Sequence, residues 1–586
     1  MAKNMRITKL IIKNYRSFDS VGQKILFPAF HSALVGKNNS GKTNIFNALN
    51  LVLGNKNPAY LRFEKDDYFD SNKPIEIQAM ISDITATDKS HIFSIPNLTK
   101  QQQGALNSKV SDGTADITFL LRKNYEYLPL DDSDEESESS QDTFEIKLWG
   151  FNVFRKKEDV RKSVIKMLMV PAIRDYQDEL SASKWTAYGQ LMKEVLENSP
   201  HYSNIKTDLS NLNIKIQQVF ETEKTKLLEG AQIVSYVDDI NFQLTKDDSP
   251  SELLRNLEIF ITEGSKKFNI EYVGTGTQNA IIIGILELAL KNKSSKIKLF
   301  CIEEPEAFIH PHGIRYLGSL IKNISKDQNT QILVSTHSLS LTANFAPNEI
   351  IRVDKTYGKT VIKQDVSIGN THFRRFIHQD NAEIFFSDRV LFIEGPTEKH
   401  LFGNLDKLTK LNPADPNGIN CNFDRINLGV IRLDSINSIV NYIKIAEAFS
   451  IPYSAIVDRD FIDDPSKQNK CKELCSEVGA SYQTSDKVKL ISDLKAKNIV
   501  VNSKGEIEDI FSDQEITSIT GKQIADIQAI KSRHTKTSKA FKEIFGVGKA
   551  EYAIVIADFY SQNTQTHPLD DIIRKIYNNN ILNINI

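Results

Sequence analysis

The chain of 586 residues is too long for one hydrophobic core, so we expect about two to four domains. Its 40% hydrophobic and 25% charged residues are typical of a globular protein, and its net charge of −2 restricts any nucleic-acid contact to local basic patches. No apolar run approaches the roughly 18 residues of a membrane span, and no signal peptide precedes the first predicted strand. We therefore expect a cytoplasmic protein with no membrane partner.

The first part of the chain has the alternating apolar pattern of β-strands. The predicted strands are 6–13, 23–35, 75–82 and 116–122. A glycine-rich turn ends the second strand, and a helix is predicted from Thr43 to about Leu53. The acidic, low-complexity segment 131–140 is predicted to be a solvated loop that avoids DNA, because like charges repel.

The middle of the chain, residues 157–268, has a mostly helical pattern, with apolar residues at helical spacing from Leu209 to Gly230. This block interrupts two groups of motifs, so we predict an insertion that packs on itself or on a second copy of the chain. Strand and helix patterns return at 269–370. A polar connector follows at 371–388, and strands then alternate with helices from 389 to 586, which is typical of an α/β domain with a parallel sheet.

A phosphate-binding loop follows the second predicted strand. The segment Gly36-Lys37-Asn38-Asn39-Ser40-Gly41-Lys42-Thr43 matches G-x-x-x-x-G-K-[ST] and lies between a strand and a helix, as that motif requires. Its glycines let backbone N–H groups surround phosphates at a helix N-terminus. We expect Lys42 to contact the β- and γ-phosphates of ATP and Thr43 to hold Mg²⁺. The candidate nucleotide-binding residues here are Gly36, Asn38, Asn39, Ser40, Gly41, Lys42 and Thr43.

Two later apolar strands end in residues that fit the same chemistry. The first ends in Glu303 and Glu304, of which one can bind Mg²⁺ and the next can orient the attacking water; a plain acidic loop is the alternative. The second ends at His337, whose order and spacing after the acidic pair favour a γ-phosphate sensor over a structural histidine. A glycine-rich turn also precedes a predicted helix, with Gly274, Gly276 and Gln278.

Together with Asn14-Tyr15-Arg16-Ser17-Phe18, these motifs resemble the ABC-type ATPases of the RecF/SMC-like branch. The resemblance implies that Gly274–Gln278 is a signature loop that completes the ATP site of a second subunit. It therefore implies a homodimer or a higher homo-oligomer. Glu303 stands where the family usually has aspartate, and it keeps the metal-binding carboxylate.

A second acidic group begins near residue 390. One apolar strand ends at Glu394-Gly395 with Glu398 four residues on, and a later strand ends at Asp458-Arg459-Asp460. Asp458 and Asp460 are two apart, so an extended strand would point both to one side. Glu394 and Glu398 can converge because the chain turns from strand to helix between them. Four carboxylates at adjacent strand ends can hold divalent metal, which phosphodiester cleavage needs; scattered surface acids are the alternative.

A third acidic segment contains Glu508, which we expect to be a further metal ligand, with Asp509 as its substitute. The alternative is a helix start with favourable acids.

The pattern E-G-x-x-E followed by D-x-D resembles a Toprim domain. An ATPase followed by Toprim resembles the OLD (overcoming lysogenization defect) family over nearly the whole chain. That resemblance implies a C-terminal lysine that stabilises transition-state charge. Lys549 matches best, with an ordinary surface lysine as the alternative.

The fold class implied is α/β: an ABC-type P-loop ATPase head with a helical insertion, followed by a Toprim α/β domain. Its predicted parts are 1–156 and 269–370 for the ATPase, 157–268 for a dimerising insertion, 371–388 for the connector, and 389–586 for Toprim with a helical extension. The resemblance implies an ATP-binding, Mg²⁺- or Mn²⁺-dependent DNA endonuclease in bacterial defence against phage. Its partner is a second copy, a helicase-like protein, or a retron reverse transcriptase with its DNA product.

Three other functions remain open on the sequence. A RecF-like ATPase clamp in DNA repair would bind DNA without cleaving it, although the intact acids at 394, 398, 458 and 460 argue against a dead domain. A topoisomerase or primase is a second alternative, but no DNA-gate module is recognisable. A nuclease that acts on RNA is the third.

Overall fold

In the computed structural model the chain forms two compact units, one of Met1–His31 with Thr43–Thr336 and one of Ser32–Lys42 with His337–Ile586. No helix in the described part of the chain is both long enough and apolar enough to cross a membrane. The described residues are 5–54, 56, 61–85, 99–111, 113, 115–125, 143–148, 151–152, 161–171, 187–219, 260–263, 265–269, 272–274, 277, 297–307, 309–326, 330–368, 371–404, 423, 427–433, 435–483, 485–502, 505–562, 568–569 and 572.

The first unit contains an antiparallel sheet in the order β2-β1-β4-β5-β6-β7. Its strands are β1 (Arg6–Lys13), β2 (Gln23–Leu26), β4 (Ile75–Ser82), β5 (Ile117–Lys123), β6 (Thr143–Leu148) and β7 (Phe151–Asn152). Along β4 every second side chain is buried, which is the period of a strand with one face on a core. The predicted strands at 6–13 and 75–82 have the observed bounds.

The same unit contains parallel strands in the order β12-β11-β8. They are β8 (Ile165–Val170), β11 (Ile297–Glu303) and β12 (Thr330–Thr336). The strand β8 lies inside the block predicted to be mostly helical, because its run Ile-Lys-Met-Leu-Met-Val supplies apolar side chains to a buried strand. The remaining elements are α1 (Lys42–Leu53), η2 (Lys65–Asp67), α3 (Lys100–Ser111), α4 (Arg161–Val164), α6 (Ala187–Glu197), α7 (Tyr202–Val219), α10 (Pro311–Ser325) and the hairpin β9 (Phe260–Glu263) and β10 (Lys266–Asn269).

The single strand predicted at 23–35 is wrong. The structure has β2 and a separate strand β3 (His31–Val35), which belong to different sheets. The break falls at Phe27-Pro28-Ala29-Phe30, where Pro28 has no N–H group to donate to a ladder. The predicted loop 131–140 and the end of the predicted helix, residues 220–230, lie outside the described residues.

In the second unit, β3 pairs in parallel with β13 (Ile350–Thr356), and β14 (Lys359–Lys363) pairs antiparallel on the other side of β13. A separate four-stranded sheet has the order β16-β15-β17-β18, and all its strands are parallel. They are β15 (Arg389–Ile393), β16 (Leu428–Arg432), β17 (Tyr453–Val457) and β18 (Ile499–Val501). Parallel strands end at one common edge, so the residues that follow β15, β17 and β18 are brought together there.

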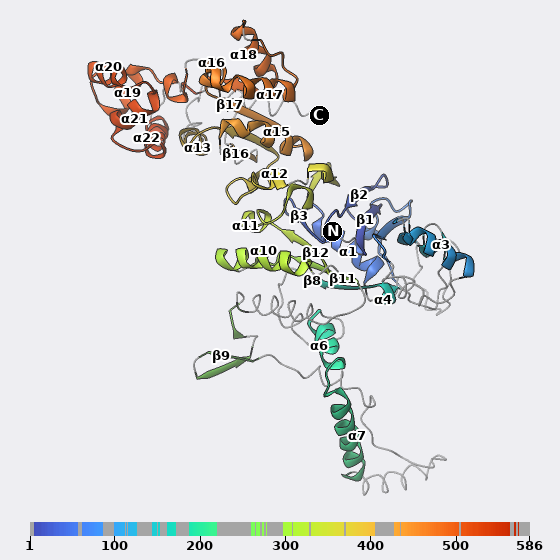
Figure 1. Cartoon of the computed structure of the whole chain (residues 1–586). Coiled ribbons are helices and arrows are strands. Elements are labelled where there is room, and N and C mark those ends of the chain that lie inside the picture. The colour runs from blue at the N-terminus through green and yellow to red at the C-terminus, as the bar shows by residue number, and fades with distance from the viewer. Residues whose placement is uncertain are drawn as a thin grey trace. The chain divides into compact units, whose positions relative to one another are not determined.

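The helices of this unit fall into two groups along the chain. Those before residue 512 are α11 (Leu339–Thr342), η5 (Pro347–Glu349), η6 (Val366–Ile368), α12 (Thr371–Arg374), η7 (Ala382–Phe385), α13 (Pro396–Gly403), η9 (Ile436–Ser438), α15 (Ile439–Ala448), α16 (Asp460–Asp463), η10 (Pro465–Lys467), α17 (Gln468–Val478), α18 (Lys487–Ala496) and η11 (Ile507–Ile510). Four more helices form a C-terminal group (Figure 1): α19 (Asp513–Thr520), α20 (Ile524–Arg533), α21 (Thr537–Phe545) and α22 (Lys549–Gln562). Their buried residues, such as Phe541 and Tyr552, share one core with Leu391 of β15 and Leu401 of α13.

Candidate functional site

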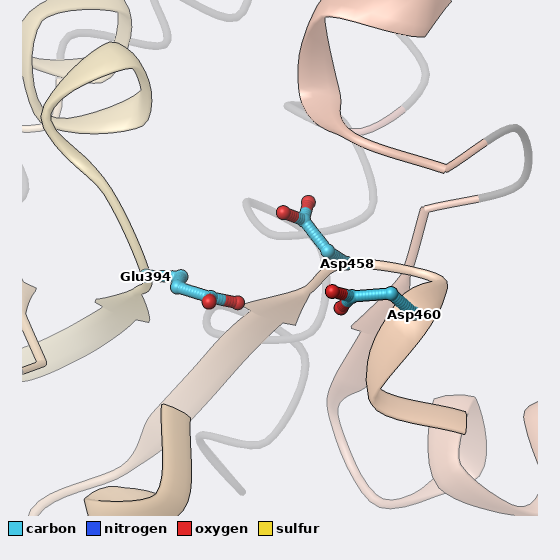
Figure 2. Close-up of side chains that lie close together, drawn as sticks. All are labelled: Glu394, Asp458 and Asp460. Atoms are coloured by element: carbon cyan, nitrogen blue, oxygen red, sulfur yellow. The ribbon is translucent and has the colours of Figure 1, made fainter. Parts of the chain in front are cut away.

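Three of the predicted carboxylates meet at the edge where β15 and β17 end. Glu394 follows β15, Asp458 follows β17, and Asp460 begins α16. One oxygen atom from each of the three carboxylates lies within 4.8 Å of the others. Figure 2 shows the side chains of Glu394 and Asp460 pointing toward one another, with Asp458 beside them. The arrangement presents three oxygen ligands to a common space.

The expectation that an extended strand carries Asp458 and Asp460 is wrong. The strand ends at Val457, and Arg459 already has helical dihedral angles, φ −61° and ψ −30°. The N–H of Phe461 donates to the carbonyl of Asp458, 3.1 Å away, as the chain turns into α16. The two carboxylates converge because of this turn rather than because of strand alternation.

Glu398 lies in α13 and is only 5% exposed. It is not among the three that surround the common space, but its carboxylate lies against Gly395, where an added Cβ would be 2.8 Å from Glu398 Oε2. Burial, and then the charge of Asp458, raises the pKa of Glu398 to about 8. The glycine therefore makes room for a fourth acid next to the group.

Burial and mutual repulsion destabilise the ionised forms of the neighbouring acids Glu394, Glu398 and Asp458. Burial, and then the neighbouring Glu394, raises the pKa of Asp458 to about 7, although Asn502 Nδ2 donates a hydrogen bond of 2.8 Å to Asp458 Oδ1. Burial also raises the pKa of Glu394. Buried like charges disfavour ionisation, and a bound cation reverses that effect. The group has the electrostatics of a cation site.

The ligand atoms fit a divalent metal. Glu394 Oε2 and Asp460 Oδ1 are buried and accept no hydrogen bond from any residue that the structure describes. Buried polar atoms of this kind normally have partners, and carboxylate oxygens are the ligands that Mg²⁺ and Mn²⁺ prefer. Lys467 Nζ lies 2.8 Å from the other oxygen of Asp460, so the chain itself already supplies one positive charge here.

Metal binding should release protons near neutral pH. Asp458 and Glu398, with pKa values of about 7 and about 8, are largely protonated at about pH 6, where protons compete with metal. We expect the apparent affinity for Mn²⁺ to rise about tenfold or more from about pH 6 to about pH 8 and to level off only above the pKa of Glu398. Titration calorimetry in two buffers of different ionisation enthalpy measures the released protons. Binding without proton release at the lower pH would contradict this expectation.

Glu508 is 2% exposed and lies in η11. Its Oε1 accepts a hydrogen bond of 2.8 Å from Thr397 Oγ1 and another from the Tyr552 hydroxyl. Its charge contributes to the raised pKa of Asp458, so it belongs to the same electrostatic group. The proposed substitute, Asp509, instead accepts from Thr537 Oγ1 and from the N–H of Glu506, which caps η11. This contrast favours Glu508 over Asp509.

Lys549 is the first residue of α22 and is partly exposed. The charges of Lys467, Lys536 and Lys549 all act to lower the pKa of Glu394, against the larger effect of burial. Lys549 is thus close enough to influence the carboxylates electrostatically. The sequence prediction included Lys549 but not Lys467, because a lysine that follows a D-x-D pattern by several residues carries no recognisable signal.

Three other residues of this region were missed from the sequence: Asn502, Thr397 and Tyr552. Asn502 follows β18 and is 1% exposed, and its Oδ1 has no hydrogen-bond partner among the described residues. An asparagine at the end of a short apolar strand, next to a strand that ends in aspartate, is the signal that was available for it. Thr397 and Tyr552 are 155 residues apart and have no local signal at all.

The phosphate-binding loop lies between β3 and α1, as predicted, with α1 beginning one residue early at Lys42. Lys42 is 6% exposed, and its Nζ donates hydrogen bonds of 2.9 Å to the carbonyl oxygens of Gly36 and Lys37. Gly36 has φ +146°, and a Cβ there would lie 2.1 Å from the Val353 carbonyl oxygen. Gly41 and Asn39 also have positive φ, Ser40 is buried, and Asn38 and Thr43 are exposed.

Glu303 ends β11 and is 7% exposed, and Glu304 has φ +42°, a strained value for a residue with a side chain. The N–H of Glu304 donates to the Ser335 carbonyl, 2.9 Å away. His337 follows β12, and its ring centroid lies 6.4 Å from that of Phe386. Gly274 is exposed, whereas Gly276 and Gln278 lie outside the described residues.

The N-terminal motif contacts the first turn of α1. Asn44 Nδ2 donates to Ser17 Oγ at 2.9 Å, and Arg16 donates to Asn44 Oδ1 at 3.4 Å. Asn14 and Arg16 both have positive φ, which bends the chain sharply here. The motif is therefore fixed beside the helix that follows the phosphate-binding loop.

Comparison with known proteins gives matches along most of the chain. Residues 5–342 match the family model for an AAA ATPase domain, and residues 385–460 match that for the overcoming lysogenization defect protein-like TOPRIM domain. The chain is 23% identical over 569 residues to the Old nuclease of Escherichia phage P2, covering 92% of this chain and 89% of that protein. It is 23% identical over 625 residues to endonuclease GajA of Bacillus cereus strain HuB5-5, covering 87% and 86%.

Among solved structures, an Smc head domain from Pyrococcus furiosus matches with a TM-score of 0.37 and 17% identity, covering 61% of this chain and 96% of that one. The range matched by the first model includes Glu303 and Glu304, and the range matched by the second includes the acids from Glu394 to Asp460. The chain belongs to the AAA ATPase domain family, and its residues 385–460 are similar to the TOPRIM domain of overcoming lysogenization defect proteins.

Proposed function

We propose that the chain is a metal-dependent DNA endonuclease whose ATPase domain regulates its Toprim domain. The observation that carries this proposal is that the carboxylates of Glu394, Asp458 and Asp460 lie close together. Two of their buried oxygens, Glu394 Oε2 and Asp460 Oδ1, have no hydrogen-bond partner among the described residues. The similarity to the Old nuclease and to endonuclease GajA supports the same reaction. A clamp that only binds DNA does not require these acids, because carboxylates without metal repel the phosphate backbone.

The residues that would hold one or two Mg²⁺ or Mn²⁺ ions are Glu394, Glu398, Asp458, Asp460 and Glu508. Bound metal would lower the pKa of a water molecule and neutralise charge on a phosphodiester. Lys549 would neutralise charge that develops on the reacting phosphate, as preorganised cations do in a partly buried site. Lys467 would keep Asp460 oriented through their hydrogen bond.

For the nucleotide we propose that Lys42 binds phosphate and that Thr43 and Glu303 hold Mg²⁺. Glu304 would orient water, and His337 would sense the γ-phosphate.

The ATP site of a second copy would be completed by Gly274, Gly276 and Gln278, so the active form would be a homodimer. A role in defence against phage follows from the family resemblance. Light scattering with and without a non-hydrolysable ATP analogue tests the dimer, and phage plating on cells that express the chain tests the defence role.

The direct test is incubation of the purified chain with supercoiled plasmid and Mg²⁺ or Mn²⁺, with and without ATP. Nicking or linearisation that EDTA abolishes supports the nuclease. The difference that ATP makes gives the sign of the regulation. Cleavage of RNA but not DNA would redirect the proposal to an RNA substrate, and no cleavage with any metal would favour the clamp.

A charge pair offers a route by which nucleotide could reach the Toprim sheet. Lys37, in the phosphate-binding loop, places its Nζ 2.6 Å from Asp388 Oδ2. Asp388 directly precedes β15, the strand that Glu394 follows. Thr360 of β14 also donates to the Ser40 carbonyl at 2.8 Å. We propose that phosphate in the loop competes with Asp388 for Lys37, so that the position of β15 depends on nucleotide.

Asp388→Asn should uncouple cleavage from ATP. The substitution removes the charge that holds Lys37 but leaves every Toprim carboxylate in place, and an exposed ion pair of this kind contributes little to stability. We expect the ratio of cleavage with ATP to cleavage without ATP to approach one, while ATP hydrolysis stays within about twofold of wild type. The matched control is Asp380→Asn, an exposed aspartate of the same connector. An unchanged ratio in Asp388→Asn would contradict this coupling.

A further inference from the structure

The buried carboxylate of Glu508 joins three distant segments of the chain. Its Oε1 accepts hydrogen bonds from Thr397 in α13 and Tyr552 in α22, and the two hydroxyls lie 3.2 Å apart. Thr397 is 1% exposed, Tyr552 is 0% exposed and Glu508 is 2% exposed. Bulk water therefore cannot replace these hydrogen bonds to the carboxylate. Because both hydrogen bonds end on the same oxygen, they fix the orientation of the carboxylate.

Each of the two hydroxyl residues is close in the sequence to a candidate site residue. Thr397 directly precedes Glu398 and is three residues from Glu394. Tyr552 is three residues after Lys549 on the same helix, and residues at this spacing lie on neighbouring positions of one helix face. The Glu508 carboxylate thus ties the helix that carries Glu398 to the helix that carries Lys549.

The ring of Tyr552 has a separate role from its hydroxyl. The ring packs against Phe541 and Phe545, with centroid distances of 5.5 and 5.6 Å. Burial, and then the charge of Glu508, raises the pKa of Tyr552, so the hydroxyl stays protonated and donates. Phenylalanine at this position could make the same aromatic contacts. The hydroxyl of Tyr552 is needed only for the hydrogen bond to the Glu508 carboxylate.

We propose that Tyr552 and Thr397 are positioning residues of the metal site: they orient Glu508 toward the metal and hold α22 so that Lys549 faces the same site. This inference rests on the proposed function, because it requires that the Toprim acids bind metal. Groups that hold a ligand in place in this way typically change metal affinity or activity by 10- to 100-fold when they are removed. The effect is therefore expected in metal binding as well as in cleavage.

The experiment compares Tyr552→Phe with Tyr560→Phe in the full chain. Tyr560 is a matched control because it lies on the same helix, is 1% exposed, and donates its hydroxyl at 3.5 Å to Glu515, a carboxylate outside the site. Mn²⁺ binding is measured by the electron paramagnetic resonance signal of free Mn²⁺, and plasmid cleavage is measured across Mn²⁺ concentrations. We expect Tyr552→Phe to weaken Mn²⁺ binding about tenfold or more, with cleavage partly restored by excess Mn²⁺. Tyr560→Phe should leave both within about twofold.

Thr397→Val and Thr397→Ser form a second pair that does not touch the aromatic core. The valine variant lacks the hydroxyl and should weaken Mn²⁺ binding, while the serine variant keeps the hydroxyl and should restore it. Equal Mn²⁺ binding in wild type and Tyr552→Phe would overturn the inference, as would equal weakening in Tyr560→Phe. No Mn²⁺ binding at the Toprim acids of the wild type, judged against Asp458→Asn, would instead overturn the proposed function itself.

Discussion

Asp458→Asn should reduce DNA cleavage by about 1000-fold or more, because several kilocalories per mole of metal-borne stabilisation are lost and each 1.36 kcal/mol is a factor of ten. The asparagine has the shape of the aspartate, and its Oδ1 can still accept the hydrogen bond from Asn502 Nδ2. ATP binding should persist, since Asp458 follows β17 and is not part of the phosphate-binding loop. Plasmid cleavage and binding of a fluorescent ATP analogue measure the two effects.

The same variant should be as stable as the wild type, or more stable, when metal is removed. The pKa of Asp458 in the folded chain, about 7, lies above its ordinary value of 3.8, so its ionised form destabilises the folded chain at about pH 8. The asparagine carries no such charge. Thermal unfolding in EDTA at about pH 8 tests this sign. Joint loss of stability, ATP binding and cleavage would show that Asp458 has a structural role and would contradict the assignment.

Lys42→Ala should reduce ATP hydrolysis by about 100-fold or more, in line with the loss of a single preorganised charge at a phosphoryl-transfer site. The Lys42 ammonium is buried and held by the carbonyl oxygens of Gly36 and Lys37, so it is fixed in the loop rather than free in solvent. Phosphate release measures hydrolysis. Cleavage by metal alone should continue, because the Toprim acids are unchanged.

The matched control for Lys42→Ala is Lys24→Ala, an exposed lysine on β2. That variant should hydrolyse ATP and cleave DNA as the wild type does. If Lys42→Ala hydrolyses ATP at the wild-type rate, the loop does not bind the nucleotide in the expected way. If Lys42→Ala also loses cleavage without ATP, the nuclease requires the intact loop for its structure.

The order of strands and helices follows from local patterns in the sequence. The alternation in β4 fixes its bounds to the residue, since a strand with one buried face repeats every two residues. In β1 a register shift between Ile7 and Lys9 interrupts this alternation. The break between β2 and β3 was missed because the apolar run continues through it, and only Pro28 marks the point where the chain changes sheets. Strand β8 was missed because its neighbours in the sequence are polar or helical, while its partner β11 is more than a hundred residues away.

The candidate site is predictable where a side chain directly follows an apolar strand. Glu394 and Asp458 meet this condition, and the family pattern adds Glu398 and Asp460. Residues that act through other residues give no such signal. Lys467 is recognisable only by its distance to Asp460, and Tyr552 only by its hydrogen bond to Glu508. These contacts depend on how helices pack on the sheet, which a single sequence does not specify.

The close approach between Gly395 and Glu398 has a consequence for protein engineering. The Glu398 carboxylate occupies the space that a side chain at residue 395 would need, since an added Cβ would lie 2.8 Å from Oε2. Transplanting the acids alone onto another parallel sheet would therefore not reproduce the group. A transplanted site would need the whole segment Glu394-Gly395-Pro396-Thr397-Glu398 and a second parallel strand followed by aspartate. It would also need a buried carboxylate, such as that of Glu508, to accept the hydrogen bond of the threonine hydroxyl.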